Sequence, residues 1–191
     1  MIMEWTANAG KELIIPDNKI LAFYKHFSHG DPDAGANMLD VLKYWRTAGL
    51  AGDKIMAFVQ IETGNNTQVM NAVNLFGNCY IGVSLPNFAV PKNTDPLQIP
   101  WVLPPGGATG KDNSPNPNNG HCIPAVGYDQ RNIYVVTWGQ LKSMSWQFYD
   151  AYMDEAYAVL SMDWINKKVG TSPSGFDLAT LEKDLAQVTA A

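Results

Sequence analysis

One histidine of this 191-residue chain stands where an imidazole could act as a general base. His121 opens the apolar run HCIPAVGYD, and a second run, NIYVVTW, begins after Gln130 and Arg131. Two such runs separated by two residues are typical of an antiparallel hairpin, in which the second strand ends near the start of the first. Thr137 is therefore expected beside His121. An imidazole fixed by a polar neighbour is the base-and-orienter part of a nucleophile, base and orienter triad.

Neither of the two cysteines is predicted to be the nucleophile of such a triad. Cys122 follows His121 directly in a strand, so its side chain is expected on the opposite face. Cys79 alternates in phase with Ile81 and Val83 and is predicted to lie in the core, where thiols stay protonated. A disulfide between the two cysteines is left open, because it requires that their strands be neighbours.

Simpler interpretations of the same residues also exist. His121 could be a histidine of a surface loop, with Trp138 as a core residue. The aromatic residues of SWQFYDAYMDEAYAVL are interpreted as sheet core rather than as an exposed partner surface. Asp154 and Glu155 are adjacent, so their carboxylates diverge and are predicted to be solvated.

A second group of residues suggests metal chemistry. The stretch HFSHGDPD holds His26, His29, Asp31 and Asp33, and two histidines three residues apart with a carboxylate could bind zinc. No paired-histidine helix with a glutamate accompanies them, so solvated side chains are the simpler interpretation. We therefore predict no metal and no cofactor. A metal-dependent hydrolase that uses His26 and His29 is a distant alternative.

The elements that must position these residues follow from the apolar periodicity. The opening MIMEWTANAG reads as the end of a helix, and Asp31 or Asp33 is expected to cap a second helix that Gly49 ends. Asn66 or Thr67 is the predicted cap of a third. The chain is predicted to be α+β, with helices first and then a mostly antiparallel sheet. Helices are expected within 31–49, 65–77, 145–153 and 176–188, strands at 54–61, 79–86, 121–129, 132–138 and 155–161, and irregular chain at 11–30 and 86–120.

Composition limits the function classes. An apolar content of 46% in 191 residues predicts one packed domain, and a formal net charge of −5 argues against a nucleic-acid partner. No apolar run reaches the roughly 20 residues that cross a bilayer, and no signal peptide is evident. Two cysteines are too few for a disulfide scaffold. A cytoplasmic or phage-associated protein without a membrane partner is expected.

The segment GHCIPAVGYDQRNIYVVTWGQ resembles the histidine segment of the papain-like cysteine peptidases. That family has a His-Ala-Val run, a VGY run, a hairpin and an Asn-Ser-Trp-Gly box. The turn and helix GANMLDVLKYWRTAGL, the helix QVMNAVNLFG and the strand CYIGVSLP agree with the family in order. The resemblance covers residues 31–139 and is clearest in the VGY and TWG boxes.

The resemblance implies a papain-like fold in a single domain over 1–191. A mainly helical half is expected at 1–78, a mainly antiparallel half-barrel sheet at 79–166 and a C-terminal helix at 176–188, with a cleft beside the histidine. The family's nucleophilic cysteine caps the first central helix, whose counterpart here is MIMEWTANAG, and that helix starts too late to include it. Two explanations are expected to compete. The chain is either a fragment of an enzyme with an upstream cysteine or a pseudo-peptidase that serves as a binding or structural module.

The family's catalytic roles map onto three residues. His121 is the expected base, Thr137 takes the place of the orienting asparagine, and Trp138 shields their contact from water. Alignment on the tryptophan instead puts Val136 in the asparagine's place, and a valine could not orient an imidazole. Hydrolysis of a peptide or isopeptide bond is the implied reaction, and the chain as given is predicted to lack it.

The resemblance also implies a substrate-binding turn. GDPDAGAN lies where the family has a glycine-rich turn before a helix, so Gly35 and Ala36 are expected to offer backbone groups to an extended peptide. Gly120, next to the histidine, is the third expected substrate-binding residue. A peptide or protein is therefore the expected partner, with the oligomeric state left open.

Overall fold

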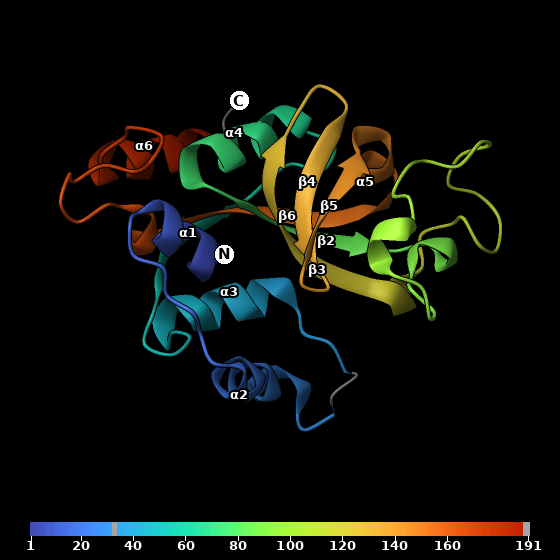
Figure 1. The fold of residues 1–191 in the computed structure, drawn as a ribbon, viewed down its shortest axis with the longest axis horizontal. Helices are drawn as coiled ribbons and strands as arrows, with labels where there is room; N and C mark the ends of the chain where they lie inside the picture. Colours follow the sequence, from blue (N-terminus) through green and yellow to red (C-terminus); the bar gives the residue numbers. More distant parts are fainter. Residues whose placement is uncertain (32–33, 189–191) are drawn as a thin grey trace. The chain divides into compact units, whose positions relative to one another are not determined.

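A computed structural model describes residues 1–31 and 34–188, which form an α+β fold with six α-helices and a six-stranded sheet. The helices and strands are shown in Figure 1. They are α1 (Ile2–Asn8), α2 (Asp17–Ser28), α3 (Met38–Thr47), β1 (Ile55–Gln60), α4 (Asn66–Phe76), β2 (Cys79–Ser84), β3 (Gly120–Tyr128), β4 (Asn132–Thr137), β5 (Gln140–Ser145), α5 (Trp146–Tyr152), β6 (Met153–Ser161) and α6 (Leu178–Val188).

The chain divides into two compact units. The described residues of Met1–Val59, Leu75–Gly77 and Val159–Ala191 form unit 1, and Gln60–Asn74 with Asn78–Ala158 form unit 2. The strand order is β1-β6-β2-β3-β4-β5, and β1 and β6 each have residues in both units. The single domain predicted over the whole chain stays a prediction.

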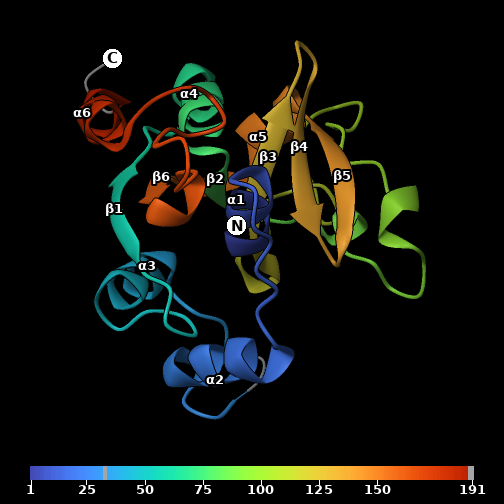
Figure 2. The same ribbon diagram turned by 60° about the vertical axis from the view of Figure 1, so that its left-hand side comes forward.

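The sheet of unit 2 is antiparallel, as predicted, from β6 through β2, β3 and β4 to β5. Figure 2 shows β3, β4 and β5 as neighbouring strands. The hairpin of β3 and β4 is confirmed, with a bulge in its register between Ala125 and Gly127. In the β2–β3 pairing, Val83 lies opposite His121 and Gly82 lies opposite Cys122. This register fixes where the histidine stands on the sheet.

The turn between β4 and β5 has an unusual composition. Its two residues, Trp138 and Gly139, have φ values of 46° and 74°. Two-residue hairpin turns with both φ values positive match the right-handed twist of the strands, and glycine suits them. A tryptophan in this region of φ is a genuine outlier. The fold therefore places a large indole at a position where its backbone is strained.

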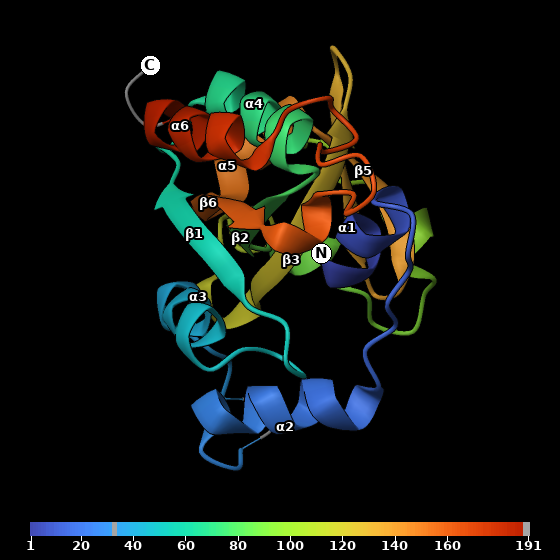
Figure 3. The same cartoon turned by 90° about the vertical axis from the view of Figure 1, so that its left-hand side faces the viewer.

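Two elements were not predicted from the sequence. The first, α2, lies in the stretch expected to be irregular, although Ile20, Phe23, Tyr24 and Phe27 follow helical spacing. Leu21 and Ile20 are 57% and 46% exposed, so the apolar residues of this helix do not form one buried stripe. The helix instead packs on α3 through aromatic contacts, and Figure 3 shows the two helices as neighbours.

The second missed element, β5, has the polar sequence QLKSMS. It pairs with β4 along its whole length, from Asn132 with Ser145 to Thr137 with Gln140. An edge strand can carry polar residues on its outer face, so β5 has too little alternation of apolar residues to be predicted from the sequence.

The predicted caps of two helices were wrong. Asn37 caps α3, because its side chain accepts a hydrogen bond from the backbone N–H of Asp40. The helix begins at Met38, too late for Asp31 to cap it, and Asp33 lies outside the described residues.

The residue that caps α4 precedes the predicted ones, Asn66 and Thr67, in the sequence. The side chain of Asn65, rather than that of Asn66 or Thr67, accepts a hydrogen bond from the Gln68 N–H at 3.1 Å. Gly77, with φ of 81°, follows the last helical residue as predicted.

The predicted loop over residues 86–120 contains three short 3₁₀ turns, η1 (Asn87–Ala89), η2 (Pro96–Gln98) and η3 (Pro117–Asn119). It belongs to unit 2 and is drawn in green to yellow in Figure 1. Between η2 and η3 the indole of Trp101 is 1% exposed, so this part of the loop is packed rather than free. Over residues 1–31 and 34–188, none of the helices has the length and apolar character that crossing a membrane requires.

Candidate active site around His121

The hairpin of β3 and β4 brings His121 and Thr137 together. His121 is the second residue of β3, and Thr137 is the last residue of β4. The imidazole Nε2 lies 2.6 Å from the Thr137 Oγ1, and the threonine is 3% exposed. Val136, the alternative orienting residue, is 39% exposed and makes no such contact among the described residues. The hydroxyl therefore fixes one side of the imidazole ring.

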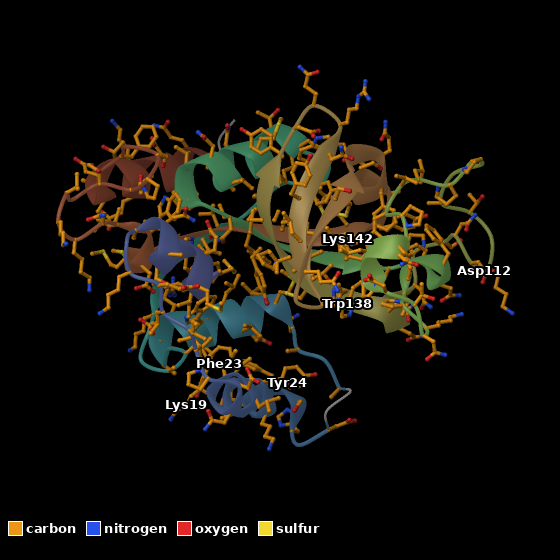
Figure 4. All side chains as sticks on the ribbon, in the orientation of Figure 1. Lys19, Phe23, Tyr24, Asp112, Trp138 and Lys142 are labelled. Carbon is orange, nitrogen blue, oxygen red and sulfur yellow. The ribbon has the colours of Figure 1, made fainter. Side chains whose placement is uncertain are left out.

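Trp138 covers the imidazole. Its ring is stacked on His121 with centroids 4.7 Å apart and an interplanar angle of 18°. The strained turn that holds Trp138 makes this stacking possible, since the indole follows directly after the threonine that bonds the imidazole. Figure 4 labels Trp138 at this end of β4. The structure thus brings His121, Thr137 and Trp138 together, and their catalytic roles stay predictions.

The other ring nitrogen of His121 is available for proton transfer. Within residues 1–31 and 34–188, Nδ1 has no hydrogen-bond partner. A neutral imidazole that donates from Nε2 to the Thr137 hydroxyl carries its lone pair on Nδ1. Burial lowers the pKa of His121 below its ordinary value of about 6.5, because the charged form loses hydration. The base form therefore predominates at neutral pH.

The lowered pKa predicts how stability depends on pH. Between the folded pKa of His121 and about 6.5, the unfolded chain binds more protons than the folded chain. The contribution of His121 to stability is therefore complete above pH 6.5 and declines as the pH falls through the folded value. Urea unfolding of the protein and of H121Q across pH 4.5–7.5 measures this difference, and an equal pH dependence in both would contradict it.

Neither cysteine is placed to react with the imidazole. Cys79 is fully buried, as predicted, and its thiol donates a hydrogen bond to the Tyr157 carbonyl at 3.5 Å. Burial raises the pKa of Cys79 far above its ordinary range. Cys122 is exposed, but desolvation of its sulfur raises its pKa to about 12, although the Tyr80 hydroxyl donates a hydrogen bond to that sulfur. Both cysteines are free, so the disulfide left open by the sequence is not formed.

The residues of the metal alternative lie in unit 1. His26 stacks on Tyr44 with ring centroids 3.9 Å apart, and His29 ends α2 with a φ of 49°. Asp33 lies outside the described residues. Within the part of the chain that the structure describes, no three histidine, cysteine or carboxylate side chains gather as metal ligands would. The geometry therefore gives no support to a metal-dependent hydrolase.

The predicted substrate-binding residues are exposed. Gly35 and Ala36 belong to unit 1, and the Gly35 N–H donates a hydrogen bond to the Tyr24 hydroxyl at 3.0 Å. Peptide binding through this N–H would have to displace that hydroxyl. Gly120 is the first residue of β3 in unit 2. The role of all three in binding stays a prediction.

Four of the five aromatic residues near α5 form core, as predicted, whereas Trp146 is only half-buried. Phe148, Tyr149 and Tyr152 on the helix and Tyr157 on β6 are at most 2% exposed. The carboxylates that follow were expected to be solvated. Asp154 is exposed, but it accepts a hydrogen bond from Ser84, and Glu155 is half-buried and accepts one from Tyr157. Glu155 is therefore only partly solvated.

Trp101 is a site residue that sequence reasoning missed. Its indole meets His121 and Trp138 edge-on, with ring centroids 6.4 Å and 5.7 Å away. It stacks on Phe148 at 5.5 Å with an interplanar angle of 3°, and its Nε1–H donates to the Ala89 carbonyl at 3.2 Å. A lone tryptophan among turn formers, in IPWVLPP, was the available signal. Trp101 therefore packs against both rings of the stacked pair, His121 and Trp138.

Lys142 is the second residue that was missed. It is only 4% exposed, and its ammonium lies 5.2 Å from the centre of the Trp101 ring. Nζ donates hydrogen bonds to the carbonyls of Pro96 and Ile99 at 2.7 Å and 2.6 Å. Lysine is rarely buried, so nothing in the sequence distinguished Lys142 from the exposed lysines.

Comparison with known proteins supports the fold. No known protein family matches this sequence, and no curated protein matches it either. The structure is similar to that of Xylellain, a cysteine protease from Xylella fastidiosa, with a TM-score of 0.54 and 14% sequence identity. The match covers 73% of this chain and 68% of Xylellain. At this identity the likeness shows the fold alone, so the chain has an α+β fold that is shared with a cysteine protease and is consistent with the papain-like fold.

Proposed function

We propose that this chain is a papain-like cysteine-peptidase domain whose reaction is hydrolysis of a peptide or isopeptide bond. The observation that carries the proposal is the 2.6 Å contact between the His121 Nε2 and the Thr137 hydroxyl beneath the stacked indole of Trp138. A base whose ring is oriented by a polar neighbour is what activation of a thiol requires. The fold shared with Xylellain supports the same class.

In the proposed reaction His121 acts first as a general base and then as a general acid. Its Nδ1 takes the proton of a cysteine thiol as the sulfur attacks the carbonyl carbon, and the imidazolium then gives that proton to the leaving amine. Water hydrolyses the resulting thioester in the same way. Thr137 orients the imidazole through Nε2, and Trp138 shields that contact from water.

The 191 residues by themselves are proposed to lack this activity, because neither cysteine is available as a thiolate. Cys79 lies in the core, where burial raises the pKa of its thiol. The sulfur of Cys122 accepts a hydrogen bond from the Tyr80 hydroxyl, and its pKa is raised to about 12. A chloromethyl ketone or vinyl sulfone peptide should therefore label neither thiol at pH 7.5, as measured by intact mass. Rapid labelling of Cys79 or Cys122 would refute this part of the proposal.

A longer chain that carries a cysteine ahead of the first helix would test the peptidase proposal. Labelling of that cysteine by the same peptide probe, and its loss in H121A, would support the peptidase. The V136A variant is the matched control, since it alters the neighbouring β4 residue without touching the imidazole. A labelled cysteine that reacts equally well in H121A would contradict the role of His121.

A peptide-binding pseudo-peptidase is the second candidate function. It is favoured because Cys79 is buried and Cys122 directly follows His121 in β3, so neither thiol is well placed to act as the nucleophile. The partner would then be a peptide or protein, in a cytoplasmic or phage-associated setting. Saturable binding of a peptide library without cleavage, together with a gene product that has no upstream cysteine, would favour this candidate over the enzyme.

A further inference from the structure

We propose that Lys142 is a positioning residue for His121 and acts through Trp101. The buried ammonium holds the segment 96–101 in place, and that segment carries the indole that backs Trp138 and His121. The catalytic meaning of this contact chain rests on the proposed function, whereas the contacts themselves do not.

The surroundings of Lys142 show what its charge does. Among the described residues no carboxylate lies within ion-pair distance of its Nζ, although Asp95 is near enough to oppose the lowering of its pKa by burial. Its two strong hydrogen bonds go to the carbonyls of Pro96 and Ile99. A buried ammonium costs free energy unless such bonds compensate it, and an apolar side chain would fill the same space without this cost. The lysine is therefore suited to holding two backbone carbonyls.

The segment that Lys142 holds needs such an anchor. Residues 86–120 lack regular structure apart from three short turns, and Lys142 bonds the first residue of η2, Pro96, and the residue that follows η2, Ile99. A second anchor follows, because the Ser145 N–H donates to the Trp101 carbonyl at 2.9 Å. Lys142 and Ser145 of β5 therefore fix the backbone of Trp101 and of the residues shortly before it. Figure 4 labels Lys142 and Trp138, and both residues belong to unit 2.

Trp101 transmits this placement to the imidazole. Its indole stacks on Phe148 and makes T-shaped contacts with both Trp138 and His121. If the segment shifts, Trp138 loses its support in a turn that is already strained, with φ of 46°. The imidazole then loses its stacking partner and becomes more exposed.

The K142M variant tests the inference by NMR of the His121 ring. Methionine has a similar length but donates no hydrogen bond to the Pro96 or Ile99 carbonyl. The Cε1–H resonance of His121 is expected to lose the ring-current shift that the stacked indole gives it. The pKa of His121 is expected to rise towards the ordinary value of about 6.5. K54M is the matched control, because Lys54 also donates to a backbone carbonyl, that of Thr47, and this variant should change neither quantity.

A double-mutant cycle separates positioning from a direct effect of the lysine charge. In a W101L background K142M should have no effect on the His121 resonance or pKa, because the connecting ring is gone. An undiminished effect there, or no effect of K142M on the resonance in the Trp101 protein, would overturn the inference. If K142M does not fold, K142L, which also donates no hydrogen bond to the Pro96 and Ile99 carbonyls, provides the same comparison. These readouts need no nucleophile, so failure of the peptidase proposal and failure of this inference are distinguishable.

Discussion

Replacing Trp101 with alanine should lower the free energy of unfolding of unit 2 by about 3–5 kcal/mol, the range for buried tryptophan or phenylalanine truncated to alanine. The indole is 1% exposed, stacks on Phe148 and donates a hydrogen bond to the Ala89 carbonyl. Its removal leaves a cavity beneath the loop. Urea unfolding combined with amide hydrogen exchange in β3, β4 and β5 measures the loss.

The neighbouring residue gives a control for the Trp101 prediction. Val102 is 50% exposed, so V102A should change the free energy of unfolding by no more than about 0.5 kcal/mol. A cost below about 1 kcal/mol for W101A would show that the loop does not depend on the indole and that the packing of Trp101 against His121 is not a fixed feature.

Replacing Thr137 with valine should destabilise the protein by about 1–3 kcal/mol and disturb the imidazole. The variant keeps the branched shape of the strand residue but removes the oxygen 2.6 Å from the His121 Nε2. A half-buried ring nitrogen is then left without a partner, which costs its desolvation energy. Urea unfolding measures the stability, and the ¹⁵N resonances of His121 report the tautomer.

Two variants make the Thr137 prediction specific. T137S keeps a hydroxyl and should retain the tautomer, and V136A removes side-chain atoms from a residue that is 39% exposed. If T137V and T137S behave alike, the hydroxyl does not orient the imidazole. If V136A alters the tautomer as much as T137V does, the change is not specific to the Thr137 hydroxyl and the predicted role of that hydroxyl is contradicted.

The parts of the fold predicted from the sequence are those with a clear apolar period. The hairpin of β3 and β4 and the buried strand β2 are examples, since alternate residues of each reach the core. Helix α2 was missed because its apolar residues are spread over more than one face, and β5 was missed because its sequence is polar. Tertiary contacts with α3 and pairing with β4 stabilise these elements, and local patterns do not record them.

The candidate site was predictable where adjacency in a hairpin determined it. His121 and Thr137 come together because two consecutive strands pair, although the bulge between Ala125 and Gly127 could not be read from the sequence. Trp101 and Lys142 could not be found in this way. One lies in an aperiodic loop and the other is a lysine in a polar strand, and both acquire their contacts only from packing.

The central claim is that the fold holds His121 as a neutral base with its lone pair on Nδ1. Long-range ¹H–¹⁵N NMR of the histidine rings, recorded between pH 4.5 and 8, tests this directly. We expect a proton on Nε2, a bare Nδ1 at neutral pH and a pKa below 6.5 for His121. A proton on Nδ1 at neutral pH, or a pKa above 6.5, would contradict the account.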